Sequence, residues 1–434
     1  MLKTTGGVLL GTLVGCSSNT PSTTTRDLGA PDTGHDIMAN DKANAPRDQE
    51  VQDSQRDRGA APDSQRDSTS PDSSPNPNAP IFFVHLSDIH LGAGSRPEPA
   101  LNLALSEILP TISPAATFAT GDLCENGNDL SNWQTYRKTV DAAGLSPLTY
   151  IETPGNHDCL LDSALKNYLA HTLAGRNAHG THGLYHVTVN GRRIRIVALN
   201  TVSAGNLVQD STGYLKEDQV NQLILQIDAD KQPVDTTLVL GHHPIVWANG
   251  LGLFHTDKNL RRLLAHTHAS AYLYGHLHLF VENWEKQTLM AMAPSLGRIN
   301  NLQGLLISLQ GFSLFALDDG PVVKPVFIHG EATSLTVEWP VVMITRPAKA
   351  GANPWVTRLT RGTFNNLLHA GVFAPNTIHA VRYRIDSGPW KTMSPKTGYY
   401  EAMFNTPNKS SCTIEVEGES SGAIGSDKLT IPLA

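Results

Sequence analysis

Short apolar runs that end in polar loops recur through the middle of the chain. Runs of four to six apolar residues bounded by turn residues are typical of buried strands. The first of them, residues 81–86, leads directly into Ser87-Asp88. The strands that this pattern predicts cover residues 81–86, 116–120, 148–153, 237–240 and 271–274.

Segments with near-helical spacing of apolar residues separate these strands. They predict helices over residues 101–109, 132–143 and 215–228. Asn190-Gly191 lies between two further apolar runs, which is a strong signal for a hairpin. The alternation predicts an α/β fold over residues 81–338. In such folds ligands bind at the carboxyl ends of the strands.

The pattern changes beyond about residue 338, where helical spacing gives way to short strands. Residues 339–434 therefore predict a small all-β sandwich of immunoglobulin-like size. This segment shows no cluster of titratable residues, so we expect it to pack or to contact a protein partner. Its predicted strands cover residues 340–345, 377–385, 399–404, 412–416 and 428–431.

Charge and composition set the N-terminal part of the chain apart. Residues 17–80 contain no Phe, Trp or Tyr and hold six Lys or Arg against eleven Asp or Glu. Such a segment cannot bury a core, so it predicts a disordered linker. It carries most of the net charge of −7. The remaining, nearly neutral region argues against general nucleic-acid binding, which needs a basic face.

Residues 1–16 read as a secretory signal with Lys3 before a short apolar segment. The run Leu13-Val14-Gly15-Cys16 resembles a bacterial lipobox, and this resemblance implies that Cys16 is lipidated and anchors the protein to a membrane. By resemblance to Gram-negative lipoproteins, Ser17 after the cysteine would favour the outer membrane of the bacterial cell envelope. The alternative is an ordinary buried cysteine after a short apolar segment.

Metal-ligating residue types follow five of the predicted strands. Each short motif is weak alone, because Gly-Asp and Gly-His are common in turns. Together they bring carboxylate, amide and imidazole groups to the strand ends, a donor set that suits a pair of Fe, Mn or Zn ions without thiolate ligands. The motifs are Asp88-Ile89-His90, Gly121-Asp122, Gly155-Asn156-His157-Asp158, Gly241-His242-His243 and Gly275-His276-Leu277-His278. We expect the histidines outside them to be non-ligands, for example His171, His179, His266, His268 and His369.

This series of motifs resembles the calcineurin-like metallophosphoesterases. The resemblance covers about 190 residues and implies a four-layer αββα sandwich with a dinuclear metal site. One ion would be held by Asp88, His90, Asp122 and His278. The other would be held by Asp122, Asn156, His242 and His276, so Asp122 would bridge the two.

The resemblance also implies a mechanism, the hydrolysis of phosphoric esters. A hydroxide between the two ions would attack phosphorus, and His157 would assist the leaving group. Glu125 stands where purple acid phosphatases have a metal-binding tyrosine, and the loops look more like those of phosphodiesterases. The substrate would be a phosphorylated small molecule, a lipid or a nucleotide. Monoester, diester and pyrophosphate substrates all remain open.

Two segments are similar to eukaryotic transmembrane members of this superfamily, namely residues 339–347 (WPVVMITRP) and the run Trp133-Gln134-Thr135-Tyr136. Those members carry an Ig-like domain after the catalytic one. The alternative function is that of an envelope binding or scaffold lipoprotein, which uses its Ig-like domain and has a vestigial catalytic domain. Intact residues at every ligand position argue against this alternative.

The cysteines leave one question open. Cys124 and Cys159 follow two of the motifs, so they could be neighbours. An oxidising envelope would then permit a disulfide between them, and two inert thiols are the equal alternative.

Overall fold

The computed structural model describes residues 76–177, 179–202, 213–244, 258–298, 309–348 and 359–434, and the backbone of residues 301–302 and 305–306. The predicted signal segment, Cys16 and the linker up to residue 75 lie outside these residues. Residues 76–80, assigned to the linker, already contact the folded region. Ala79 is buried, and Asn76 Nδ2 donates a hydrogen bond to the Tyr399 hydroxyl at 3.3 Å.

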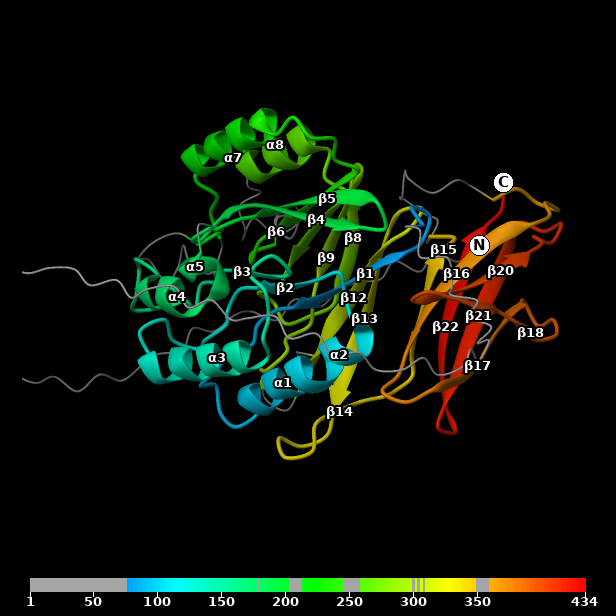
Figure 1. Cartoon of the computed structure of the whole chain (residues 1–434), viewed down its shortest axis with the longest axis horizontal. Helices are drawn as coiled ribbons and strands as arrows, with labels where there is room; N and C mark the ends of the chain where they lie inside the picture. The colour runs from blue at the N-terminus through cyan, green and yellow to red at the C-terminus, as the bar shows by residue number, and fades with distance from the viewer. Residues whose placement is uncertain are drawn as a thin grey trace, which may run out of the picture. The chain divides into compact units, whose positions relative to one another are not determined.

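Six strands form the first sheet, in the order β14-β13-β12-β1-β2-β3 (Figure 1). β1, β2 and β3 run parallel, and β12 pairs with β1 in the antiparallel sense. The strands are β1 (Ile81–Leu86), β2 (Ala116–Thr120), β3 (Tyr150–Thr153), β12 (Gly311–Leu317), β13 (Pro321–His329) and β14 (Thr336–Val337).

A second six-stranded sheet has the order β4-β5-β6-β7-β9-β8. β5, β6, β7 and β9 are parallel. Asn190 and Gly191 join β4 to β5 with φ angles of 53° and 77°, as the predicted hairpin turn requires. The strands are β4 (Gly183–Val189), β5 (Arg192–Ala198), β6 (Thr236–Leu240), β7 (Ala271–Tyr274), β8 (Val281–Glu285) and β9 (Thr288–Met292). A short pair, β10 (Asn301–Leu302) and β11 (Leu305–Leu306), follows them.

Helices cover the outer faces of both sheets, which confirms the predicted four-layer αββα architecture (Figure 1). The first sheet is covered by α1 (Pro97–Leu103), a π-helical segment η1 (Ala104–Ile108), α2 (Leu109–Ile112), α3 (Leu130–Ala142), α4 (Lys166–His171) and α5 (Leu173–Arg176). The second is covered by α7 (Glu217–Ala229) and α8 (Lys258–Thr267). The predicted helix over 101–109 therefore belongs to a longer segment. It begins with a proline in the first turn and ends where Ser113 adopts a left-handed conformation.

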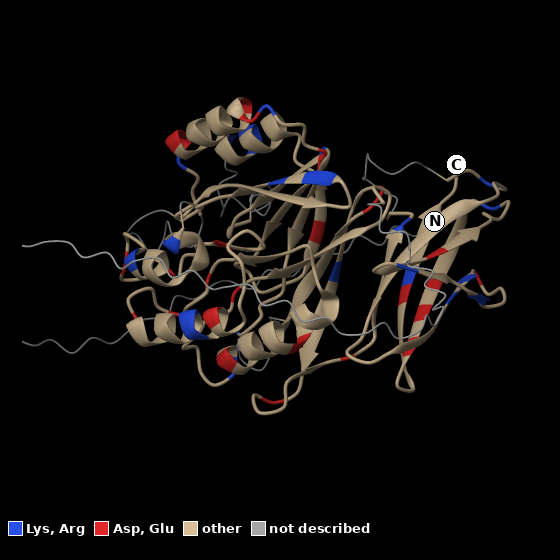
Figure 2. Ribbon diagram, viewed as in Figure 1, with Lys and Arg blue, Asp and Glu red and all other residues tan. Residues whose placement is uncertain are grey.

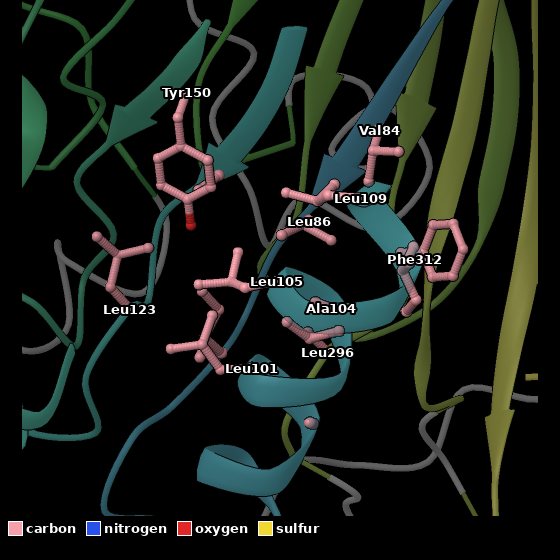
Figure 3. Packing of buried hydrophobic residues seen from close by; sticks show 14 of the residues in the cluster. Val84, Leu86, Leu101, Ala104, Leu105, Leu109, Leu123, Tyr150, Leu296 and Phe312 are labelled. Atoms are coloured by element: carbon pink, nitrogen blue, oxygen red, sulfur yellow. The ribbon is translucent and has the colours of Figure 1, made fainter. Parts of the chain in front are cut away.

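β1 is buried on both faces, which explains why its sequence is uniformly apolar. Val84 and Leu86 face the helices, where Leu101 and Leu105 pack against them (Figure 3). Phe83 faces the second sheet, and its ring lies 5.3 Å from that of Phe118. A strand enclosed in this way fixes the position of the loop that follows it.

The C-terminal region contains two four-stranded sheets, with orders β15-β16-β20-β19 and β18-β17-β21-β22. They enclose one apolar core, which is consistent with the predicted Ig-like sandwich. The strands are β15 (Val341–Arg346), β16 (Asn366–Phe373), β17 (Ile378–Ile385), β18 (Lys391–Thr392), β19 (Ser394–Lys396), β20 (Tyr399–Phe404), β21 (Ser411–Ser420) and β22 (Ala423–Pro432).

Basic and acidic residues alternate across these strands (Figure 2). Arg382 lies opposite Glu417 and Arg384 lies opposite Glu415, with Nη2–Oε2 distances of 2.8 and 2.6 Å. Both guanidinium groups also stack on the Trp390 ring. Cross-strand pairs of this kind stabilise the register of the sheet.

The first sheet and β15, β16 and β20 share one apolar cluster. The rings of Phe82 on β1 and Phe373 on β16 lie 5.0 Å apart, edge to face. Polar contacts add to this interface, because His369 Nδ1 lies 2.9 Å from Asp318 Oδ2 and Trp339 Nε1 donates to Glu107 Oε1 at 2.8 Å. Among the described helices, none has the length and apolarity needed to cross a lipid bilayer.

The core between the two sheets generates a stability prediction. Phe83 is fully buried there, so the variant Phe83→Ala should lower the free energy of unfolding by about 3–5 kcal/mol. Phe364 is 75% exposed, and Phe364→Ala is the matched control, with an expected change within about 0.5 kcal/mol. Urea unfolding followed by tryptophan fluorescence measures both. Equal losses in the two variants would contradict the assignment of Phe83 to the core.

Candidate metal centre

The five motif-bearing loops meet at one edge of the two sheets. Asp88 follows β1 of the first sheet, and His276 follows β7 of the second. The His276 backbone N–H donates to Asp88 Oδ1 and Oδ2 at 3.1 and 3.0 Å, which joins the two sheets at this point. Residues that are 188 positions apart in the sequence are therefore in direct contact.

Asp88, His90 and His278 form the first group of donor atoms. The Nε2 atoms of His90 and His278 lie 3.0 Å apart, and His278 Nε2 lies 3.4 Å from Asp88 Oδ1. All three residues are buried. Two imidazole nitrogens bound to one ion at about 2.1 Å, at roughly a right angle, would have a separation of about 3 Å.

Asn156, His242 and His276 form the second group. Asn156 Oδ1 lies 3.1 Å from His242 Nε2 and 3.0 Å from His276 Nδ1. His243 also lies here, with its ring centroid 4.6 Å from that of His276. The sequence motif contains His243, but our predicted ligand set did not include it.

Asp122 lies between the two groups. Its Oδ2 atom is 3.2 Å from His242 Nε2 in the second group and 3.6 Å from His90 Nε2 in the first. Its Oδ1 atom accepts a hydrogen bond from the His157 backbone N–H at 2.8 Å. This is the position that a bridging ligand would need.

Hydrogen bonds behind the site orient two of the imidazoles. His242 Nδ1 donates to the Thr120 carbonyl oxygen at 2.8 Å, and His90 Nδ1 donates to Glu125 Oε2 at the same distance. When these rings are neutral, each therefore presents a lone pair on Nε2 to the centre. Buried lone pairs that face carboxylate oxygens repel one another unless cations lie between them. The donor set therefore fits two transition-metal ions.

The backbone is held in an uncommon conformation at this edge. Five residues here have positive φ between 51° and 81°, namely Asp88, His90, Asp122, His276 and His278. Asp and His tolerate the left-handed region better than most residues, but clustering of such conformations is typical of functional sites. Gly155 has no room for a side chain, since a Cβ there would overlap the backbone nitrogen and carboxylate of Asp122.

Burial and charge act in opposite directions on the titratable groups. Burial raises the pKa of Asp122, but His242, His157 and His90 outweigh it and hold the pKa well below the usual range. Burial lowers the pKa of His242, yet Asp122 raises it to about 9. A carboxylate that remains ionised although buried is the state needed to bind a cation.

Asp158 and His157 have separate roles in the loop after β3. Asp158 accepts hydrogen bonds from the backbone N–H groups of Cys124 and Gly155 at 3.0 and 2.8 Å, so it ties the second and third loops together. His157 Nδ1 donates to the Glu125 carbonyl at 2.8 Å, which leaves Nε2 as the nitrogen that can contact a substrate.

Sequence reasoning missed Glu125 and Arg298 as members of this site. Glu125 contacts His90 and pairs with Arg298, whose Nη1 lies 3.0 Å from both carboxylate oxygens. The position of Glu125, three residues after Asp122, was a usable signal. Arg298 follows a strand that the sequence did not predict, so no motif pointed to it.

The remaining predictions have mixed outcomes. The structure has Cys124 and Cys159 as buried thiols rather than as a disulfide. His266 contacts Asp228 and His369 contacts Asp318, both away from the centre. The metal-ligand roles and the role of His157 stay predictions.

Comparisons with known proteins show which proteins this chain is similar to. Residues 83–280 match the family model of calcineurin-like phosphoesterases. The chain is 25% identical to transmembrane protein 62 of Mus musculus over 379 residues, which are 81% of this chain and 55% of the relative. It is also 25% identical, over 223 residues, to an Arabidopsis thaliana protein named as a metallophosphoesterase, covering 46% of this chain and 29% of that protein. The chain thus spans about half or less of the length of these relatives.

Solved structures give weaker likenesses. GAP50, the anchor in the inner membrane complex of Plasmodium, has a TM-score of 0.41 and 18% identity, with 59% of this chain and 88% of that chain covered. A dimetal phosphatase from Danio rerio has a TM-score of 0.40 and 12% identity, with 59% and 98% covered. Neither likeness carries an inference about this chain.

The match to this family model agrees with the family resemblance that the sequence motifs predicted. Residues 83–280 are therefore similar to the calcineurin-like phosphoesterases.

Proposed function

We propose that this protein hydrolyses phosphoric esters with two transition-metal ions of the Fe, Mn or Zn type. The observation that carries the proposal is the position of Asp122, whose Oδ2 atom faces His90 Nε2 at 3.6 Å and His242 Nε2 at 3.2 Å. One ionised, buried oxygen between two imidazole groups is what a dinuclear site requires.

The chain's own residues supply the positions and the proton. Two bound ions would supply positive charge for the phosphoryl oxygens and would lower the pKa of a water molecule. Asp88, His90 and His278 would hold one ion, and Asn156, His242 and His276 the other, with Asp122 shared. His157 Nε2 would donate a proton or a hydrogen bond to the departing alkoxide oxygen, since Nδ1 is held by the Glu125 carbonyl.

We infer from the sequence the cellular context of this activity. Lipidation of Cys16 would attach the protein to the bacterial outer membrane, and residues 17–75 would span the distance to the folded region. The substrate would be a phosphorylated small molecule, a lipid or a nucleotide that reaches the cell envelope. The C-terminal sandwich would be available to a protein partner.

Metal content tests the dinuclear site. Purified protein reconstituted with Mn²⁺ should hold two ions per chain by mass spectrometry of the metals. Asp122→Asn should hold fewer and should lose about 100-fold or more of its turnover, because it removes the shared negative charge. Asp141→Asn is the control, since this carboxylate pairs with Arg176 away from the site. Two retained ions in Asp122→Asn would contradict the bridging role.

Leaving-group dependence tests His157. His157→Ala should keep both ions but lose about 10²–10⁴-fold in turnover of an alkyl phosphate, because no residue then assists the alkoxide. A p-nitrophenyl ester has a good leaving group and should lose less. His171→Ala is the matched control, since His171 Nδ1 also donates to a backbone carbonyl at 2.8 Å. Wild-type turnover of the alkyl ester by His157→Ala would exclude the role.

Lipidation tests the membrane anchor. In a bacterial host fed with labelled palmitate, the full-length protein should incorporate label and sediment with membranes. Cys16→Ser should lose both properties, because the acyl chains need the thiol. Ser17→Ala keeps the cysteine and should retain the label. Labelling of Cys16→Ser would show that the anchor lies elsewhere.

A further inference from the structure

Arg298 is fixed beside the metal centre by two independent contacts. Its backbone N–H donates to Ser295 Oγ at 2.9 Å, and Ser295 Oγ in turn donates to the Asp88 carbonyl at 2.8 Å. Its side chain pairs with Glu125, with Nη1 3.0 Å from both Oε1 and Oε2. Arg298 is therefore held at both its backbone and its side chain. Its recorded side-chain contacts are with Glu125 and not with Asp88 or Asp122.

Arg298, Glu125 and His157 form a partly exposed group next to the buried ligands. Their side chains are 33%, 24% and 25% exposed, whereas those of His90 and Asp122 are 1% and 2% exposed. Glu125 lies between the other two, because its Oε2 atom is 3.0 Å from Arg298 Nη1 and 3.7 Å from His157 Nδ1. The same oxygen lies 2.8 Å from Nδ1 of the buried His90.

Arg298 retains binding capacity after it has paired with Glu125. A guanidinium has five N–H donors in a planar fork and keeps its charge at any working pH. The ion pair engages Nη1 alone, so Nη2 and Nε present their own N–H groups. Glu125 also accepts from His90 and is therefore shared between two donors. The ion pair with Glu125 holds the guanidinium in place and leaves the N–H groups of Nη2 and Nε available to a ligand.

Phosphomonoesters and phosphodiesters differ in the number of non-bridging oxygens that such a cation can bind. A phosphomonoester has three non-bridging oxygens and two negative charges above its second pKa, and a diester has two oxygens and one charge. A pair of metal ions can engage two of these oxygens. A third charged oxygen remains only in the monoester, and a charge-assisted hydrogen bond to a guanidinium is its natural partner.

We propose that Arg298 binds the third non-bridging oxygen of the substrate's phosphoryl group and thereby selects phosphomonoesters over diesters. This inference rests on the proposed function, because it assumes that the phosphoryl group binds at the metal centre. It assigns Arg298 to substrate binding and Glu125 to positioning.

Ligand binding tests the inference separately from turnover. Full-length, Mn²⁺-loaded protein is titrated by calorimetry at pH 8 with inorganic phosphate and with dimethyl phosphate. Arg298→Ala should weaken phosphate binding about tenfold or more, with metal content and melting temperature unchanged, and should change dimethyl phosphate binding by less than about twofold. Arg298→Lys should recover part of the loss, since lysine keeps the charge but not the fork.

Arg176→Ala is the matched control. Arg176 also pairs with a carboxylate, with Nη2 2.6 Å from Asp141 Oδ1, and its side chain is 25% exposed. This variant should bind both probes as the wild type does. Equal weakening of both probes in Arg298→Ala, no weakening of either, or loss of metal would each overturn the assignment.

Turnover of p-nitrophenyl phosphate and bis(p-nitrophenyl) phosphate completes the test. Arg298→Ala should raise KM for the monoester more than for the diester. A wild-type protein that binds phosphate in an Arg298-dependent way but hydrolyses neither ester would refute the proposed function and leave the binding role intact. Hydrolysis of both esters with an unchanged KM ratio in Arg298→Ala would refute the binding role alone.

Discussion

The arrangement of the whole site depends on bringing ionised carboxylates and imidazole lone pairs together inside the protein. Asp88 and Asp122 are almost entirely buried and stay ionised because histidines surround them. Removing such charges from water is costly unless cations or hydrogen bonds compensate. Thr120, Glu125 and the strained turns hold the donors against this repulsion. The fold therefore keeps in place a cluster that is favourable only when it binds positive charge.

Both sheets contribute donor atoms to the site. β1, β2 and β3 contribute the carboxylates and the amide from one side. β6 and β7 contribute His242, His276 and His278 from the other. The apolar layer around Phe83 and Phe118 sets the spacing of the sheets. Packing far from the chemistry thus determines whether the donor atoms meet.

The sequence allowed prediction of those parts of the molecule that are encoded locally. The bounds of β1, β2 and β7 are as predicted, and the Asn190-Gly191 hairpin is confirmed. β12 and β16 were not predicted. β12 begins with Gly311 and contains Ser313, which interrupt its apolar run, and β16 begins with residues that also suit a helix.

At the metal centre, too, the sequence allowed prediction only of residues that belong to local motifs. The motifs after the strands predicted which residues gather there, since parallel strands bring their carboxyl ends to one edge. Arg298 could not be found, because its contact with Glu125 spans 173 positions and depends on where β9 ends. Asp158 was noted only as part of a motif, although its bonds to two backbone groups tie neighbouring loops together.

The packing of Phe82 against Phe373 means that the C-terminal sandwich completes the core of the preceding domain. A protein truncated after residue 338 would lose the contact between Phe373 and Phe82 and would expose apolar side chains of the first sheet to water. Such a fragment would tend to self-associate through these apolar side chains. Its metal-binding residues would follow a strand, β1, that had lost part of its packing. The sandwich therefore contributes to the stability of the preceding domain as well as to its own.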